Sequence, residues 1–118
     1  MSIIDDDISV RVAVADIVRS MDLTANTFAS GQDFLTSNSL ADTACIVADV
    51  QMPGISGIQL QQALKVKDLK IPMIFITAYP DERIRAKALD GGAICFLNKP
   101  FGGGAIIECI ERALSTRE

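Results

Sequence analysis

The sequence contains no histidine and no tryptophan, and only 5% of its 118 residues are aromatic. The lack of histidine excludes catalysis by an imidazole acid or base and excludes histidine ligation of a metal ion. No apolar run approaches the roughly 18 residues that a membrane-spanning helix requires. Residues 1–7 are acidic, unlike the basic start of a signal peptide. We therefore expect a cytoplasmic protein that makes no membrane contact.

Basic residues are also scarce. Eleven lysines and arginines stand against 15 acidic residues, and the net charge is −4. Binding to nucleic acid depends on clustered lysine and arginine side chains that contact phosphates. We therefore expect no direct binding of nucleic acid by this domain.

Cysteine occurs three times, at Cys45, Cys95 and Cys109. Each lies in an apolar run, and the spacing of the three matches no metal-binding motif. Buried cysteines commonly behave as small apolar side chains. We therefore expect three reduced, buried thiols in preference to a disulfide or a metal site.

Apolar residues are abundant, at 49% of the chain, and 118 residues suffice for one well-packed core. Short apolar or β-branched runs predict five strands, at residues 2–4, 23–28, 43–48, 73–77 and 94–97. An amphipathic helix is predicted after each strand. The first of these helices carries one apolar stripe, formed by Val10, Val14, Ile17, Val18 and Met21.

Regular alternation of strand and helix requires right-handed crossovers, with helices on both faces of a parallel sheet. The predicted fold is therefore α/β: a flavodoxin-like, three-layer, doubly wound, five-stranded parallel sheet of (βα)5 order. We expect residues 1–118 to form a single domain. Three glycines, 102–104, precede the last helix. Because glycine costs about 1 kcal/mol per helical position, we expect this helix to begin late.

Polar side chains follow four of the predicted strands. They are Asp5, Asp6 and Asp7 after the first strand, Asp49 after the third, Thr77 at the end of the fourth and Lys99 after the fifth. Because the carboxyl ends of parallel strands meet at one edge of a sheet, we expect these side chains to lie close together.

Three neighbouring carboxylates repel one another unless a cation lies between them. Oxygen ligands without histidine or cysteine favour Mg²⁺, and a hydroxyl and an ammonium group would complete an anion site. Such a site fits phosphoryl transfer to a carboxylate, with an aspartate as the nucleophile.

These residues resemble the receiver domain of two-component response regulators. The resemblance is carried by the acidic cluster at residues 5–7, by the segment 49–57, by Thr77-Ala78 and by the segment 96–101. The four motifs occur in this order, at matching spacing, over nearly the whole chain. The resemblance implies a CheY-like fold and a role in phosphorelay signal transduction.

The resemblance also implies the roles of the site residues. Asp49 would accept a phosphoryl group from a sensor histidine kinase or a phosphotransfer protein. Asp5, Asp6, Asp49 and the backbone carbonyl of Gln51 would hold Mg²⁺, and Thr77 and Lys99 would bind the phosphoryl oxygens. By this resemblance the chain is a signalling domain and not an enzyme with a separate substrate, although it catalyses its own phosphoryl transfer and autodephosphorylation.

Phe96 and Thr77 would form a switch, and Lys99-Pro100 would be a cis peptide. The surface expected to respond comprises the fourth helix, the fifth strand and the last helix, with Arg83, Ile84, Arg85, Lys87 and Phe96. It would bind a partner or, in a homodimer, another receiver domain. The resemblance is compatible with a stand-alone receiver and with a receiver joined to an effector domain.

Two other hypotheses fit part of the pattern. A phosphatase of the haloacid dehalogenase type would use Asp5 and Asp7 as its Asp-x-Asp pair, but would leave Asp49 without a role. It would also need a later acidic pair and a cap insertion, neither of which is obvious. A pseudo-receiver would be an interaction module without phosphorylation, and the complete set of acids, threonine and lysine argues against it.

Overall fold

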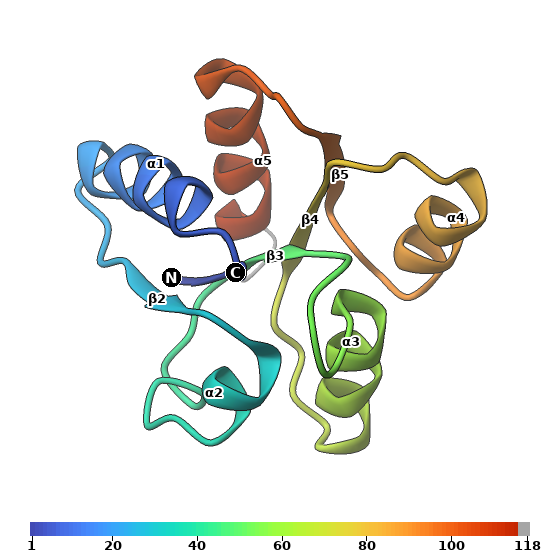
Figure 1. Cartoon of the computed structure of the whole chain (residues 1–118). Coiled ribbons are helices and arrows are strands. Elements are labelled where there is room, and N and C mark those ends of the chain that lie inside the picture. Colours follow the sequence, from blue (N-terminus) through green and yellow to red (C-terminus); the bar gives the residue numbers. More distant parts are fainter. Residues whose placement is uncertain (116–118) are drawn as a thin grey trace.

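The computed structural model describes residues 1–115, which form a five-stranded parallel sheet flanked by five helices (Figure 1). The strands are β1 (Ser2–Ile4), β2 (Asn26–Phe28), β3 (Ile46–Asp49), β4 (Met73–Thr77) and β5 (Cys95–Asn98). The helices are α1 (Ile8–Ser20), α2 (Gly31–Leu35), α3 (Gly57–Val66), α4 (Glu82–Asp90) and α5 (Gly103–Ser115). The strand order β2-β1-β3-β4-β5 is that of the flavodoxin-like folds, which confirms the predicted architecture.

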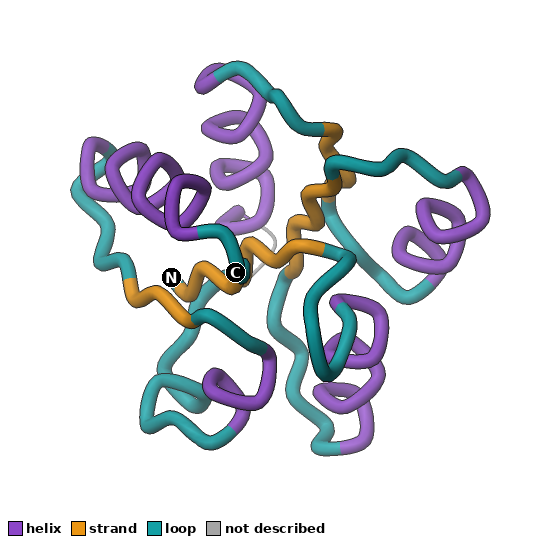
Figure 2. Tube along the Cα trace, viewed as in Figure 1, coloured by secondary structure: helices purple, strands orange, loops and turns teal. Residues whose placement is uncertain are grey.

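Helices cover both faces of the sheet, which gives three layers (Figures 1 and 2). One core cluster lies between the sheet and the helices α1 and α5, and includes Val14 and Ile110. The other lies between the sheet and the helices α2, α3 and α4, and includes Phe34, Leu60 and Ala88. Within residues 1–115, no helix combines the length and the apolar character needed to cross a bilayer.

The central strands are buried on both faces, because their successive side chains point into opposite clusters. On β1, Ile3 enters the cluster under α1 and α5, whereas Ile4 enters the other. On β4, Ile74 and Ile76 enter the first cluster, whereas Phe75 enters the second. This double burial explains why the strands appear in the sequence as short apolar runs without polar alternation.

Side-chain caps define where the helices begin. Ser30, Ser56 and Asp81 are the N-caps of α2, α3 and α4. The cap of α3 is a complete capping box, in which the Gln59 side chain accepts the backbone N–H of Ser56 at 2.8 Å. Gly92, just beyond α4, has a φ of +100°, a conformation that glycine adopts readily.

Some predicted boundaries are wrong. The strand β2 covers residues 26–28 instead of 23–28, because it pairs only with the three residues of β1. The strands β3 and β5 each end one residue later than predicted and begin later as well. The last helix does not begin late, since α5 starts inside the glycine run at Gly103. Its buried residues Ile106, Ile110 and Ala113 anchor the helix and offset the glycine penalty.

The expectation of three reduced thiols is also wrong. Cys95 on β5 and Cys109 on α5 form a disulfide, with Cα atoms 6.1 Å apart. Only the packing of α5 beside β5 brings these sulfurs together, so their spacing in the sequence gives no sign of the pairing. Cys45 is fully buried, as expected.

Gly57, the first residue of α3, is expected not to tolerate alanine. An added Cβ would lie 2.8 Å from the Asp49 carbonyl oxygen and 2.9 Å from the Val50 Cα, which are backbone atoms with little freedom to move. We expect Gly57→Ala to lower the free energy of unfolding by about 1–3 kcal/mol in urea denaturation. Gly104→Ala is the matched control, since nothing lies within 4 Å of its Cβ position. It should stabilise α5 by up to about 1 kcal/mol, and equal effects of the two substitutions would contradict this packing.

Candidate functional site

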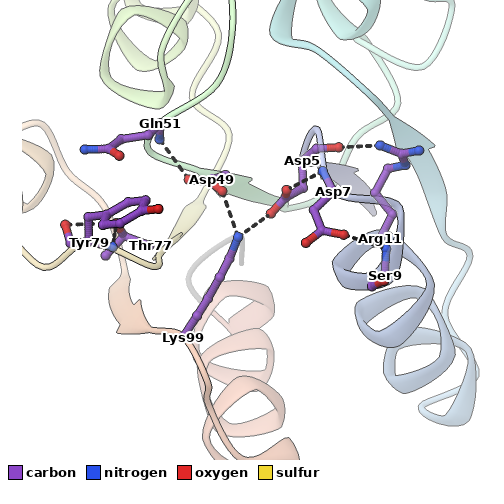
Figure 3. A network of polar contacts seen from close by, with 9 residues as sticks. All are labelled: Asp5, Asp7, Ser9, Arg11, Asp49, Gln51, Thr77, Tyr79 and Lys99. Carbon is purple, nitrogen blue, oxygen red and sulfur yellow. Dashed lines mark hydrogen bonds and ion pairs between the residues drawn. The ribbon is translucent and has the colours of Figure 1, made fainter.

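Five of the predicted site residues lie at the carboxyl edge of the sheet, and Figure 3 shows four of them, Asp5, Asp49, Thr77 and Lys99. Asp5 directly follows β1, Asp49 ends β3, Thr77 ends β4 and Lys99 directly follows β5. Asp6 follows Asp5 in the same loop. The strand order places β1 next to β3, β3 next to β4, and β4 next to β5. The sheet therefore presents these residues side by side, as the sequence predicts.

The Lys99 ammonium group lies between two carboxylates (Figure 3). Its Nζ donates to Asp49 Oδ2 at 2.8 Å and to Asp5 Oδ2 at 3.0 Å. The side chain of Asp5 is fully buried, that of Asp49 is 9% exposed and that of Lys99 is 17% exposed. Buried charges are tolerated when they are paired and hydrogen-bonded, and Lys99 meets this need for both acids.

Backbone groups hold the remaining carboxylate oxygens. Asp49 Oδ1 accepts the N–H of Gln51 at 2.8 Å, and Asp5 Oδ1 accepts the N–H of Asp7 at 2.8 Å. The Arg11 guanidinium on α1 donates to the Asp5 backbone carbonyl at 2.6 Å. Sequence reasoning missed Arg11, because the apolar stripe of α1 marks only the side of the helix that faces the core. These contacts fix both carboxyl groups before any ligand binds.

The electrostatics of Asp5 and Lys99 follow from this geometry. Burial raises the pKa of Asp5, and the nearby charge of Asp49 adds to the effect, whereas hydrogen bonds from the Asp7 backbone and from Lys99 oppose it. Burial of the ammonium group lowers the pKa of Lys99, but its hydrogen bonds to Asp49 and Asp5 and their negative charges outweigh this, so that the pKa is raised. The site therefore keeps Lys99 charged and makes Asp5 costly to ionise.

Asp5, Asp6 and Asp49 each place a carboxylate oxygen within 4.8 Å of the other two. Asp5 and Asp49 are buried and Asp6 is exposed, so the cluster is open on one side. An all-oxygen donor set of this kind suits Mg²⁺, which typically binds one or two carboxylates and retains water. The donor chemistry thus fits the predicted ion.

Asp7 takes a structural role. Its carboxylate accepts the backbone N–H of Ser9 at 2.8 Å and caps α1. The phosphatase hypothesis requires Asp7 to act beside Asp5 as an Asp-x-Asp pair. Because the Asp7 carboxylate is used as a helix cap, the structure does not favour that pairing.

Thr77 is only 1% exposed, and its hydroxyl makes hydrogen bonds within the loop that follows β4. It accepts the N–H of Tyr79 at 3.1 Å and is 3.2 Å from the Tyr79 carbonyl oxygen, to which it donates. The Thr77 carbonyl also accepts the backbone N–H of Lys99 at 2.7 Å. Thr77 is therefore tied to the lysine through the backbone, while its hydroxyl is held by the following loop.

Phe96 on β5 is partly buried, and its ring centroid lies 6.4 Å from that of Phe75 on β4. Three residues after Phe96, the Lys99-Pro100 peptide bond is cis, as predicted. Phe96 thus lies at the margin of the core, two strands away from Asp49.

A cleft of about 620 Å³ lies at the opposite edge of the sheet. Its lining includes Gln61 and Lys65 of α3, Met73 at the start of β4 and Gly91 after α4. Its lining includes none of the candidate site residues, so the cleft is not part of this site.

Comparison with known proteins gives one consistent result. A family model described as the response regulator receiver domain matches residues 1–111. The chain is 38% identical to the transcriptional regulatory protein TdiR of Thauera aromatica, over 96% of this chain and 50% of that protein. It is 37% identical to the transcriptional regulatory protein FixJ of Azorhizobium caulinodans, over 95% of this chain and 53% of that protein. The chain therefore spans about half the length of these relatives.

Solved structures agree. The crystal structure of FixJ-N matches with a TM-score of 0.86 at 33% identity, covering 97% of this chain and 91% of that one. The response regulator StyR matches with a TM-score of 0.90 at 38% identity, covering 98% of this chain and 58% of that one. These similarities support the receiver hypothesis and give no support to the phosphatase hypothesis.

Proposed function

The chain belongs to the response regulator receiver domain family, and from this premise we propose that residues 1–118 form one receiver domain phosphorylated on Asp49. The donor is a phosphohistidine of a sensor histidine kinase or of a phosphotransfer protein. The observation that carries this proposal is the position of Asp49, whose carboxylate lies 2.8 Å from the Lys99 ammonium and within the cluster of Asp5 and Asp6.

In the transfer step, a carboxylate oxygen of Asp49 attacks the phosphorus atom. The new O–P bond forms as the N–P bond to the donor imidazole breaks. The Gln51 N–H orients the Asp49 carboxylate, and Lys99 brings a positive charge that offsets the charge of the phosphoryl oxygens. Attack of water on the phosphorus atom then breaks the bond to the Asp49 oxygen, releases inorganic phosphate and regenerates the carboxylate.

Asp5, Asp6, Asp49 and the backbone carbonyl of Gln51 would hold Mg²⁺, which when bound supplies positive charge to the transferring phosphoryl group. Lys99 exchanges partners in this scheme. It neutralises Asp5 and Asp49 before phosphorylation, and it binds a phosphoryl oxygen afterwards. Among the described residues, Lys99 forms side-chain hydrogen bonds only with Asp5 and Asp49. This exchange of partners explains why the lysine lies between the two acids.

Millimolar Mg²⁺ is expected to raise the melting temperature of the protein, because it binds the carboxylate cluster only when the chain is folded. At ten times its dissociation constant, an ion with one site adds about 1.4 kcal/mol to the free energy of unfolding. Asp6→Asn should blunt this increase, since Asp6 is the exposed member of the cluster and its loss disturbs no buried contact. Differential scanning calorimetry with and without Mg²⁺ tests the expectation, and an unchanged melting temperature in the wild-type protein would refute the metal assignment.

Phosphorylation is proposed to change the surface formed by α4, β5 and α5. Arg83, Arg85 and Lys87 on α4 are exposed, and Ile84 is partly buried beside them. This surface would bind an effector or a second receiver in a homodimer. TdiR and FixJ are transcriptional regulators, so control of transcription in the cytoplasm is the output that this similarity supports. The acidic receiver itself makes no contact with DNA in this proposal.

Thr77→Ala is expected to separate phosphorylation from signalling. The Thr77 hydroxyl now holds the Tyr79 backbone, and we expect it to turn to the phosphoryl group and leave space into which Phe96 rotates. The alanine variant should still accept phosphate but should lose the chemical shift changes of residues 83–97 that beryllofluoride induces by NMR. Thr77→Ser keeps a hydroxyl and should retain these changes. An alanine variant with the wild-type pattern of changes would rule out this switch.

A further inference from the structure

The disulfide between Cys95 and Cys109 lies outside the site described above. It joins β5 to α5 across 14 positions of sequence, and the two residues are 7% and 5% exposed. The segment between them contains Lys99 and the three glycines 102–104. A single covalent bond therefore closes the segment that carries the lysine of the candidate site.

The fold does not depend on this bond. Two extensive core clusters already fix the sheet and its helices, whereas disulfides are usually required only in domains below about 40 residues. As reduced thiols, Cys95 and Cys109 would still suit their apolar cluster, because a buried thiol packs as a small hydrophobic group. Their Cα separation of 6.1 Å lies in the ordinary range for disulfides, so the bond can form and break without a backbone rearrangement.

Arg112 supplies a charge beside one of the sulfurs. Its Nη1 donates to Cys95 Sγ at 3.5 Å, and Arg112 itself is exposed on α5. A guanidinium next to sulfur stabilises the thiolate, which is the form that reacts with oxidants and disulfides. This contact favours Cys95 as the attacking sulfur of the pair and Cys109 as the sulfur that resolves it.

We propose that Cys95 and Cys109 are a reversible redox modification site that controls how firmly the Lys99 segment is held. In the oxidation, the Cys95 thiolate attacks one oxygen of hydrogen peroxide. The O–O bond breaks, hydroxide departs, and Cys95 becomes a sulfenic acid. Cys109 sulfur then attacks this sulfur, the S–O bond breaks, and water departs with the Cys109 proton. A dithiol reductant reverses the change by donating two electrons and two protons, and becomes a disulfide itself.

The glycine run explains why the bond matters for Lys99. Around Gly102, Gly103 and Gly104 nothing lies within 4 Å of a Cβ position, so no side-chain packing holds this stretch and its backbone is held by the hydrogen bonds of the first turn, from Ala105 and Ile106 to the Gly102 carbonyl. The disulfide is a covalent restraint on α5 that lies beyond the run. In the reduced protein we expect the first turn of α5 to open more often, and with it the segment that holds Lys99 against Asp5 and Asp49.

The test compares the two redox forms of the full chain, with no phosphoryl donor present. Dithiothreitol-reduced protein is treated with hydrogen peroxide, its free thiols are alkylated in denaturant, and its intact mass is measured. We expect one alkylated cysteine after peroxide and three after renewed reduction of the native protein. Amide hydrogen exchange of residues 99–105 should be about tenfold slower in the oxidised form, and the melting temperature about 5–10 °C higher.

Three results would overturn the proposal: oxidation to sulfinic acid without a disulfide, a disulfide that dithiothreitol cannot reduce in the native protein, or equal exchange in both forms. Cys45→Ala should behave as the wild type, whereas Cys109→Ser should form no intramolecular disulfide. Arg112→Gln should slow disulfide formation several-fold. If a cysteine variant fails to fold, the wild-type comparison still decides the question. Disulfide formation and its effect on exchange are measured without a phosphoryl donor, whereas phosphorylation is measured by labelling of Asp49, so failure of this proposal is distinguishable from failure of the phosphorylation proposal.

Discussion

Asp49→Asn is expected to abolish covalent labelling of the protein by acetyl phosphate in the presence of Mg²⁺. An asparagine amide is not a nucleophile towards phosphorus, whereas the aspartate carboxylate forms an acyl phosphate. Asparagine is isosteric and keeps an Oδ1 that can accept the Gln51 N–H, so the fold should be preserved. In intact-mass spectrometry the wild-type protein should gain one phosphoryl group and the variant none.

Asp7→Asn is the matched control for this experiment. Asp7 lies in the same acidic run but caps α1 through Ser9, and asparagine is an equally good N-cap. Labelling of this variant should equal that of the wild-type protein. Labelling that persists in Asp49→Asn but disappears in Asp5→Asn would reverse the assignment, since it would place the nucleophile at the end of β1.

The sequence alone predicts that four site residues lie close together, because the topology of the sheet determines their positions. They are Asp5, Asp49, Thr77 and Lys99. Once the sequence is known to alternate strands and helices, parallel pairing places all carboxyl ends at one edge, whatever the side chains do. The identity of the acids then suggests a cation. This inference needs only the order of residues along the chain, which explains why small errors in strand boundaries did not disturb it.

Contacts between elements distant in the sequence were not predictable in the same way. Lys99 contacts both carboxylates because its side chain is long enough to lie between them. The contact of Arg11 with the Asp5 carbonyl depends on how α1 is rotated about its axis. The Cys95–Cys109 bond depends on where α5 packs against β5, and two apolar runs with one cysteine each do not reveal it. Such features follow from packing geometry, which a linear pattern of hydrophobic residues specifies only coarsely.

Lys99→Ala should strongly destabilise the protein in the absence of Mg²⁺. The lysine is the cation that neutralises Asp5, which is fully buried, and Asp49, which is nearly so. Removing one partner of a buried ion pair leaves uncompensated charge and typically costs about 3–5 kcal/mol. Because the Lys99 side chain remains 17% exposed, we expect a loss near the lower end, about 3 kcal/mol, in urea denaturation at pH 7.

The pH dependence has a definite sign. The pKa of Lys99 is raised above its ordinary value of 10.5, so its stabilising effect is complete below 10.5 and is lost as the pH rises through the folded-state pKa. Wild-type protein and Lys99→Ala should therefore converge in stability at strongly alkaline pH. Lys87→Ala, which removes an exposed lysine of α4, should match the wild-type protein over the whole range.

Mg²⁺ should restore much of the stability that Lys99→Ala loses. In the variant the carboxylates of Asp5, Asp6 and Asp49 repel one another without a compensating charge, so a bound cation relieves more repulsion than in the wild-type protein. The increase in urea midpoint with Mg²⁺ should consequently be larger in the variant. Adding Asp5→Asn to Lys99→Ala should recover stability without the ion, because it removes the most deeply buried charge. If Lys99→Ala were as stable as the wild-type protein, or indifferent to Mg²⁺, Lys99 would not be the charge that holds this site together before phosphorylation.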